Sequence, residues 1–96
     1  MTPVEANLEA RGLRPLAEHV AREYHVTLDE LLGNGRGMGE SHARHVMWAV
    51  LRARGHWSWA RLGMLFCRDH TTIMAGVKRV PGPEIARFAE KEAVHA

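Results

Sequence analysis

The sequence predicts an all-α fold, a small helical domain, on three observations. Apolar residues recur at intervals of three and four along most of the chain, and capping residues stand before several of these stretches. No segment alternates apolar and polar residues as a half-buried strand does. With 96 residues, 46% of them hydrophobic, the chain is long and apolar enough for one domain with a modest core.

Three short helices are predicted first, over residues 2–12, 14–24 and 28–32. Apolar residues one turn apart mark the buried face of the first helix, and Gly12 ends it. Thr27 and Glu30 have the spacing of a capping box, in which each side chain accepts from a backbone N–H at the helix start. We therefore expect the third helix to begin after Thr27 and to stop at Gly33.

Residues 33–39 read Gly-Asn-Gly-Arg-Gly-Met-Gly, and four glycines at alternate positions predict a flexible loop. A phosphate-binding P-loop does not fit, because no Gly-Lys-Ser/Thr ending follows and no apolar strand precedes the glycines. Arg36 is the only charged residue of the loop. A mobile loop with one arginine can enter a DNA minor groove, whose narrow walls deepen the negative potential. The alternative is a surface arginine in a linker.

The longest helix is predicted over residues 40–54, where a strong apolar stripe has Trp48 at its border and Gly55 follows the last turn. Arg44 lies off this stripe in the first turn. Because it is close to the glycine loop, Arg44 is placed where it could meet a phosphate.

The segment Pro-Gly-Pro at residues 81–83 is expected to break the chain. A final helix is predicted over residues 84–94. Ile85, Phe88 and Ala89 share one side of that helix, which is the side expected to face the core.

Residues 58–80 have the pattern of two short helices joined by a tight turn at Cys67 and Arg68. Ser58 and Asp69 stand where N-caps are needed, since each offers a side-chain oxygen to the unpaired N–H groups of a first turn. This pattern is typical of a helix-turn-helix, whose second helix presents its first residues to base edges in the major groove.

The second helix of this unit has two distinct faces. Ile73, Val77 and Val80 are spaced by four and three residues, so they are expected to face inward. The opposite side begins with small polar residues and ends with a basic one. It carries His70, Thr71, Met74 and Lys78, with Thr72 near its edge.

Positive charge is concentrated in one part of the chain. Residues 34–80 hold eight Arg or Lys against two Asp or Glu, a net +6, whereas the preceding residues sum to −3 and the following ones to −1. This distribution is the electrostatic footprint of a phosphate-binding surface. The alternative is a solvated basic face.

No enzyme, metal site or cofactor is predicted. His42 and His45 lie one turn apart, but a zinc site needs three or four ligands, so exposed helix histidines are the preferred interpretation. Cys67 and His70 match a nucleophile and its base in composition alone, without an oxyanion donor or a third orienting group. The three tryptophans are expected to pack in the core or against a partner rather than to stack on bases.

Neither a membrane segment nor an export signal is predicted. No apolar run approaches the roughly 18 residues of a membrane span, and no basic start followed by an apolar stretch marks a signal peptide. One cysteine allows no internal disulfide, which fits a reducing compartment. We expect a cytoplasmic, nucleoid-associated protein. The opening Met and the additional first helix favour a complete short protein over a fragment.

Residues 68–80, Arg-Asp-His-Thr-Thr-Ile-Met-Ala-Gly-Val-Lys-Arg-Val, resemble the signature segment of the C-terminal DNA-binding domain of DnaA, the bacterial replication initiator. The similarity extends back through residues 20–32, the loop with Arg36 and the long helix with Arg44, and covers roughly residues 14–80. The Arg-Asp-His-Thr-Thr run at a recognition-helix start, after a Leu-Gly-x-x-Phe helix, is a specific motif.

The resemblance implies sequence-specific binding of double-stranded DNA. In the family the Asp, His and Thr of the signature read bases in the major groove, a loop arginine enters the minor groove, and a helix arginine contacts phosphate. Arg36 and Arg44 match these two arginines, and Met74 matches an aliphatic site that can touch a thymine methyl group. Asp can accept from cytosine, and His can donate to guanine. The predicted DNA-binding residues are Arg36, Arg44, Arg68, Asp69, His70, Thr71, Thr72, Met74 and Lys78.

The sequence departs from the family pattern in two places. The family has two glycines between the Phe and the Arg of the turn, whereas Cys67 stands there alone, so we expect a turn one residue shorter and a tilted recognition helix. The loop also has fewer Lys and Arg, which predicts weaker binding because fewer counterions are released. The ATP-hydrolysing module of the initiator is absent from these 96 residues, so we expect no ATP-driven origin opening.

The expected organisation is an N-terminal helical extension (1–13), a DnaA-like helix-turn-helix DNA-binding domain (14–80) and a C-terminal helix (81–96). The expected function is regulation of replication or transcription through DNA binding, without ATPase activity. Other replication or transcription proteins are further candidate partners, and no membrane is expected. The alternative is a protein-interaction module that kept the fold and lost tight DNA binding, which the glycine-diluted loop and exposed tryptophans would favour. The target site and the oligomeric state stay open.

Overall fold

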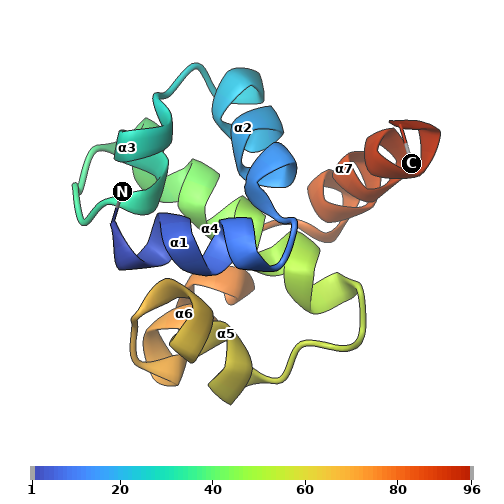
Figure 1. The fold of residues 1–96 in the computed structure, drawn as a ribbon. Coiled ribbons are helices and arrows are strands. Elements are labelled where there is room, and N and C mark those ends of the chain that lie inside the picture. The colour runs from blue at the N-terminus through green and yellow to red at the C-terminus, as the bar shows by residue number, and fades with distance from the viewer. Residues whose placement is uncertain (1, 96) are drawn as a thin grey trace.

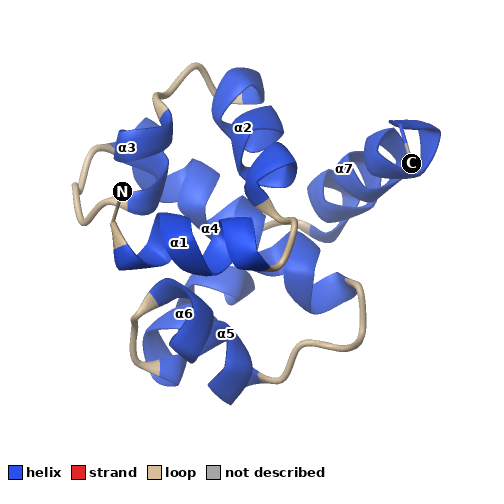
Figure 2. Ribbon diagram, viewed as in Figure 1, coloured by secondary structure: helices blue, strands red, loops and turns tan. Residues whose placement is uncertain are grey.

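The computed structural model describes residues 2–95, and the side chains of residues 2–88. Within this range the chain forms helices and loops and no strand (Figure 2), which confirms the predicted all-α fold. In chain order the helices are α1 (Pro3–Ala10), α2 (Arg14–Glu23), α3 (Leu28–Leu32), α4 (Met38–Ala53), α5 (Trp59–Phe66), α6 (His70–Lys78) and α7 (Gly82–His95). None of the helices in this range is long and apolar enough to cross a membrane.

Helix α4 is the element around which the others pack (Figure 1). It contacts α2, α3, α5, α6 and α7, and in its middle, residues 46–51, no residue is more than 1% exposed. A helix that is apolar all round must be surrounded by other elements to be stable in water. The other helices each add a buried apolar side chain to the core: Leu8, Leu16, Leu31, Leu62, Ile73 and Phe88.

The predicted N-caps are confirmed. The hydroxyl of Thr27 accepts from the N–H of Glu30 at 3.1 Å, and the carboxylate of Glu30 accepts from the N–H of Thr27 at 2.9 Å. Ser58 accepts from the first turn of α5 at 3.1 Å, and Asp69 accepts from the N–H of Thr71 at 2.8 Å. Because a cap depends only on residues two or three positions away, the sequence locates these helix starts well.

Two predicted helix starts are two residues too late. α4 begins at Met38 rather than at residue 40, and the carboxylate of Glu40 accepts from the N–H of Gly37, just before the helix, at 3.2 Å. α7 begins at Gly82 rather than at residue 84. A proline is tolerated in a first helical turn, where its missing N–H has no helical partner.

The apolar side predicted for α7 is only partly within the described side chains. Phe88 is buried and Ile85 is partly buried against the core. The expected position of Ala89 beside them concerns a side chain outside the described residues.

Helix α6 approaches α4 closely because Gly76 has no side chain. A Cβ at this position would lie 2.7 Å from Cδ2 of His45 and 2.7 Å from Cζ3 of Trp48. This close approach covers Trp48, which is 1% exposed. The prediction that Trp48 lies at the border of the apolar stripe is therefore wrong, because α6 packs on that part of the helix.

Gly76→Ala is expected to lower the free energy of unfolding by about 1–3 kcal/mol, because the added Cβ forces packed rings to move. Urea denaturation followed by tryptophan fluorescence measures this loss. Gly82→Ala is the matched control, since a Cβ at Gly82 meets nothing within 4 Å and should change stability by less than about 0.5 kcal/mol. Equal stabilities of the two variants would contradict the close packing of α6 on α4.

One carboxylate attaches α7 to both α2 and α4. Glu84 accepts a hydrogen bond from the hydroxyl of Tyr24 and lies with its Oε1 2.7 Å from Nε2 of His42. Burial raises the pKa of Glu84, but the hydrogen bonds from Tyr24 and His42 and the charges of His42 and Arg87 outweigh it, so the pKa is lowered overall. Burial and the bond to Glu84 raise the pKa of Tyr24. The carboxylate therefore stays ionised and the phenol neutral.

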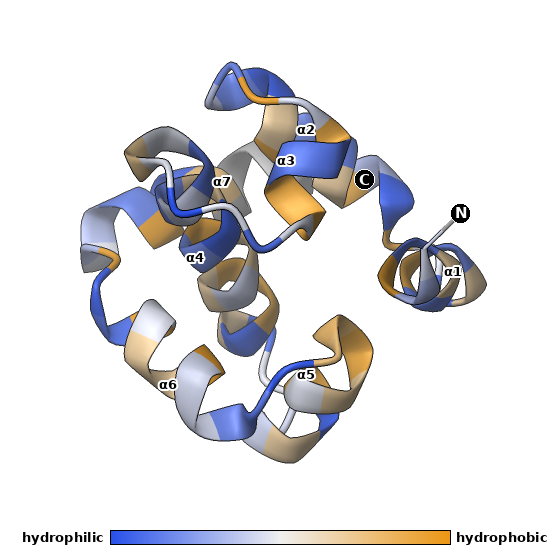
Figure 3. Ribbon diagram, turned by 90° about the vertical axis from the view of Figure 1, so that its left-hand side faces the viewer, coloured by the Kyte–Doolittle hydropathy of each residue, from blue (hydrophilic) through white to orange (hydrophobic). Residues whose placement is uncertain are grey.

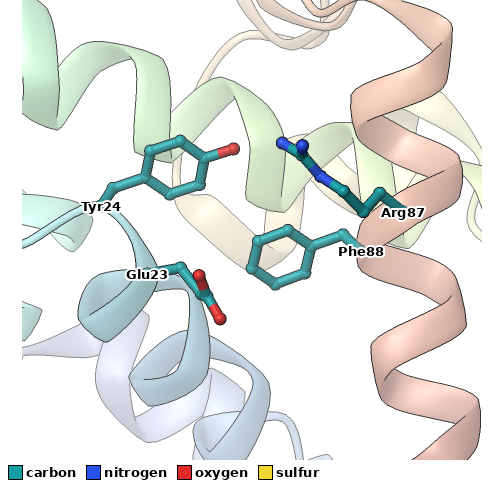
Figure 4. Close-up of a pocket in the computed structure, with 4 residues that line it drawn as sticks. All are labelled: Glu23, Tyr24, Arg87 and Phe88. Atoms are coloured by element: carbon teal, nitrogen blue, oxygen red, sulfur yellow. The ribbon is translucent and has the colours of Figure 1, made fainter.

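A hollow of about 290 Å³ lies beside this contact, between the end of α2 and α7. Figure 4 shows the four residues that line it, Glu23, Tyr24, Arg87 and Phe88. The rings of Tyr24 and Phe88 stack with centroids 6.2 Å apart and planes 9° apart. Aromatic packing and the Glu84 contact together hold α7 on the body of the domain.

Lowering the pH is expected to destabilise the attachment of α7. Because the pKa of Glu84 is depressed in the folded protein, its contribution is complete above the ordinary value of 4.5 and is lost as the pH falls through the folded-state pKa. Glu84→Gln keeps two acceptor lone pairs but cannot titrate. Its free energy of unfolding should fall less than that of the wild type between about pH 6 and about pH 3.5, as measured by urea denaturation. The same pH dependence in both proteins would contradict this role.

Candidate nucleic-acid interface

The turn between α5 and α6 is closed without a glycine at its left-handed position. Cys67 has φ 54° and ψ 45°, a conformation that glycine adopts most easily. The N–H of Cys67 donates to the carbonyl of Met64 at 3.4 Å, and the N–H of Arg68 donates to that of Gly63 at 2.9 Å. A Cβ on Gly63 would lie 2.7 Å from the carbonyl oxygen of Arg68. Gly63 therefore makes room for the turn.

Asp69 fixes the start of α6. One of its carboxylate oxygens accepts from the N–H of Thr71 at 2.8 Å and from its hydroxyl at 2.6 Å. The bonds from the hydroxyl and N–H of Thr71, with the charge of nearby His70, hold the pKa of Asp69 below its usual value. An ionised carboxylate at this place caps the helix and suits the positive end of its dipole.

The residues predicted to read DNA bases lie on the surface of α6. His70, Thr71 and Thr72 are exposed at the start of the helix, and Lys78 is exposed at its end. Met74 is partly buried between them. The start of α6 therefore presents an imidazole, hydroxyl groups and methyl groups to the outside.

Arg44 lies beneath the glycine loop. It is 7% exposed, and its guanidinium donates to three carbonyls, those of Glu30 at 2.8 Å, Leu31 at 2.9 Å and Gly35 at 3.1 Å. Burial and the nearby charge of Arg68 lower its pKa. Arg44 therefore supports the loop from inside, whereas its expected phosphate contact stays a prediction.

Arg68 joins the turn to the glycine loop. Its guanidinium donates to the carbonyl of Gly33 and lies over the ring of Trp48, 5.6 Å from the centroid. Arg68 is partly buried, and this burial lowers its pKa. Figure 3 shows hydrophilic residues along both connected segments, the loop before α4 and the turn before α6. The bond from Arg68 places these two segments next to each other.

Arg36 is exposed in a loop whose backbone is held on either side of it. Arg44 binds the carbonyl of Gly35, and Glu40 accepts from the N–H of Gly37. A Cβ at Gly35 or Gly37 would lie 2.5 or 2.6 Å from the carboxylate of Glu40. Two of the glycines thus leave space for this carboxylate. Sequence reasoning missed this role of Glu40, although the acid three residues after Gly37 was a visible capping signal.

The histidines and the cysteine form no metal-binding group within the part of the chain that the structure describes. His42 is paired with Glu84. His45 packs beside Trp48, and burial together with nearby cationic groups, Arg79 foremost, lowers its pKa. The preferred interpretation of His42 and His45 as exposed helix histidines is wrong, because both are partly buried between helices.

Two adjacent helices, a tight turn and an exposed polar helix start define a helix-turn-helix, a class of DNA-binding domain. A family model described as "Bacterial dnaA protein helix-turn-helix" matches residues 15–80. The chain belongs to this family, which confirms the resemblance identified from the sequence.

Three relatives of this chain carry the name chromosomal replication initiator protein DnaA. The protein of Mycoplasma pneumoniae is 32% identical over 77 residues, which cover 80% of this chain and 16% of the relative. That of Corynebacterium jeikeium is 39% identical over 64 residues, 66% of this chain and 11% of the relative. That of Mycobacteroides abscessus is 34% identical over 70 residues, which cover 73% of this chain and 14% of the relative. The chain thus spans a small part of these relatives, and no solved structure matches it.

Arg44→Lys is expected to lower the free energy of unfolding by about 2–3 kcal/mol, because an ammonium group cannot replace the fork of guanidinium donors and leaves buried carbonyls unpaired. Chemical denaturation measures the loss. Arg36→Ala is the matched control from the same loop region: its side chain is exposed, so stability should change by less than about 0.5 kcal/mol. A loss for Arg36→Ala as large as that for Arg44→Lys would contradict the supporting role of Arg44.

Proposed function

We propose that the chain binds double-stranded DNA at specific sequences, with the start of α6 in the major groove and Arg36 in the adjacent minor groove. The observation that carries this proposal is the contact of Arg68 with Gly33, which holds the Arg36 loop beside the turn that precedes His70. Because the loop and the start of α6 are already held side by side, they can enter neighbouring grooves of one duplex. Little free energy is then spent on ordering them when DNA binds.

The exposed groups of α6 have the chemistry that base readout requires. His70 can donate to the acceptors of guanine, and the methyl group of Thr71 can contact that of thymine. The hydroxyl of Thr71 donates to Asp69 in the free protein, so its side chain is oriented before DNA arrives. Lys78, at the other end of α6, is placed to neutralise a phosphate. Met74 is placed to contact a thymine methyl group.

We also propose that the chain acts by occupying DNA sites, as a competitor at replication initiator sites or as a transcription regulator, without ATP hydrolysis. The family membership and the names of the relatives support a role connected with replication initiation. Site occupancy needs only the domain described here. Exposed tryptophans would favour the alternative, a protein-interaction module, but Trp48 and Trp57 are only 1% and 5% exposed. Trp59 is partly buried under the guanidinium of Arg52. That part of the alternative is therefore wrong.

Selection from a pool of duplexes with a random core is expected to yield a preferred sequence. His70→Ala and Thr71→Ala should each weaken binding to that duplex by about 1–3 kcal/mol and relax the preference at the contacted position.

Arg36→Ala should weaken binding as well. Lys78→Ala should weaken it for all duplexes and reduce the slope of log affinity against log salt by about 1. Fluorescence anisotropy at two salt concentrations measures these effects.

Arg22→Ala is the control for charge alone, because Arg22 is exposed on α2, away from the proposed contacts. It should leave the base preference unchanged. If the wild type binds no duplex even at low salt, DNA binding is wrong and the protein-interaction module becomes the better hypothesis.

A further inference from the structure

Helix α1 lies outside residues 15–80, the part that matches the family, yet it packs directly on the helix-turn-helix unit. It contacts α5 as well as α2, and its Leu8 is 1% exposed. Figure 1 shows α1 running across the domain, next to α5. α1 is therefore fixed against the first helix of the DNA-reading unit.

The polar contact of α1 with this unit is made by Asn7. Its side-chain Nδ2 donates to the carbonyl of Leu65 at 3.1 Å and lies 3.9 Å from Sγ of Cys67. Leu65 belongs to the last turn of α5, whose carbonyls have no N–H partner within the helix. Two other carbonyls of that turn, those of Gly63 and Met64, accept from the turn itself. Asn7 thus satisfies a carbonyl that the turn does not reach and contacts the side chain of the turn's left-handed residue.

The contact of Asn7 with Cys67 matters because Cys67 has a left-handed backbone conformation. A residue with a Cβ occupies the left-handed region less readily than glycine does, and here Cys67 must hold it for Arg68 to close the turn. The direction of α6 depends on this turn, since Asp69 caps α6 only two residues later. A contact that steadies Cys67 therefore steadies the helix that follows.

We infer that Asn7 is a positioning residue for the recognition helix: it holds the turn of Cys67 in its left-handed form and so sets the direction in which α6 presents His70 and Thr71. Arg68 connects the same turn to the glycine loop, through the carbonyl of Gly33. The effect on base recognition rests on the proposed DNA binding. The support that Asn7 gives to the turn is a property of the free protein and is tested without DNA.

The first test measures amide hydrogen exchange in the free protein. Asn7→Leu keeps the approximate volume and removes the donor, and Asn7→Asp keeps the shape and replaces the donor by an acceptor. In both variants the amides of Cys67 and Arg68 should exchange about three- to tenfold faster, the effect of losing one hydrogen bond. Amides in the middle of α4 should exchange at the wild-type rate. Ala10→Ser, at an exposed position of α1, is the control. It should leave the exchange rates of the turn amides and of the α4 amides unchanged.

The second test adds Cys67→Gly to each Asn7 variant. Glycine adopts the left-handed conformation without the cost that a Cβ brings, so the double variants should regain the slow exchange of the turn. With the duplex obtained by selection, the Asn7 variants should lose several-fold in the ratio of specific to non-specific affinity, and Cys67→Gly should restore it. A residue that only adds general stability would not alter this ratio and would not be rescued at Cys67.

The inference is overturned if the Asn7 variants keep the wild-type exchange of the turn, or if glycine at position 67 fails to rescue them. If the wild type binds no duplex, the proposed function fails by itself. Faster exchange that is rescued by glycine would then still support the bracing of the turn, because that measurement contains no DNA.

Discussion

The buried guanidinium of Arg44 is the interaction on which the arrangement of the interface depends. It donates to two carbonyls of α3 and to one of the glycine loop. The carbonyls of Glu30 and Leu31 belong to a helix of five residues, which has too few internal hydrogen bonds to be stable alone. A guanidinium has five N–H donors in a rigid plane, so one side chain can hold a short helix and the following loop in a single geometry.

A series of polar contacts continues from Arg44 to α6. Gly33, at the end of α3, accepts from Arg68 in the turn, and Asn7 of α1 also contacts the turn. All three side chains are at least partly buried and act on backbone carbonyls. The exposed residues His70, Thr71 and Arg36 thus lie on segments whose backbone is held in place by partly buried polar side chains. If these exposed residues bind a ligand, the rigid backbone beneath them would reduce the conformational entropy lost on binding.

Local features of the fold could be predicted from the sequence, and non-local ones could not. The caps at Thr27, Ser58 and Asp69 involve residues two or three positions away, so a short window of sequence contains all the information. The same holds for the helical apolar stripes and for the family signature at residues 68–80.

Features that depend on how helices meet were missed. Arg44 and Arg68 were expected at the surface, because charged residues off an apolar stripe usually are. Their partners are 9 to 14 and 35 residues away, and Asn7 meets residues 58 and 60 positions later. The burial of Trp48 depends likewise on Gly76 in another helix. The base and phosphate contacts of the candidate site remain predictions, since their partner is a second molecule.

The packing of α1 on α5 has a consequence for how the boundaries of this domain are drawn. The match to the family model begins at residue 15, but a fragment cut there would lose Leu8 from the core and Asn7 from the end of α5. Such a fragment would keep every motif by which the family is recognised, while the turn would lose its contact with Asn7. The packed unit is therefore longer than the stretch that the family model matches, and excision at residue 15 is expected to yield a less rigid protein than the chain itself.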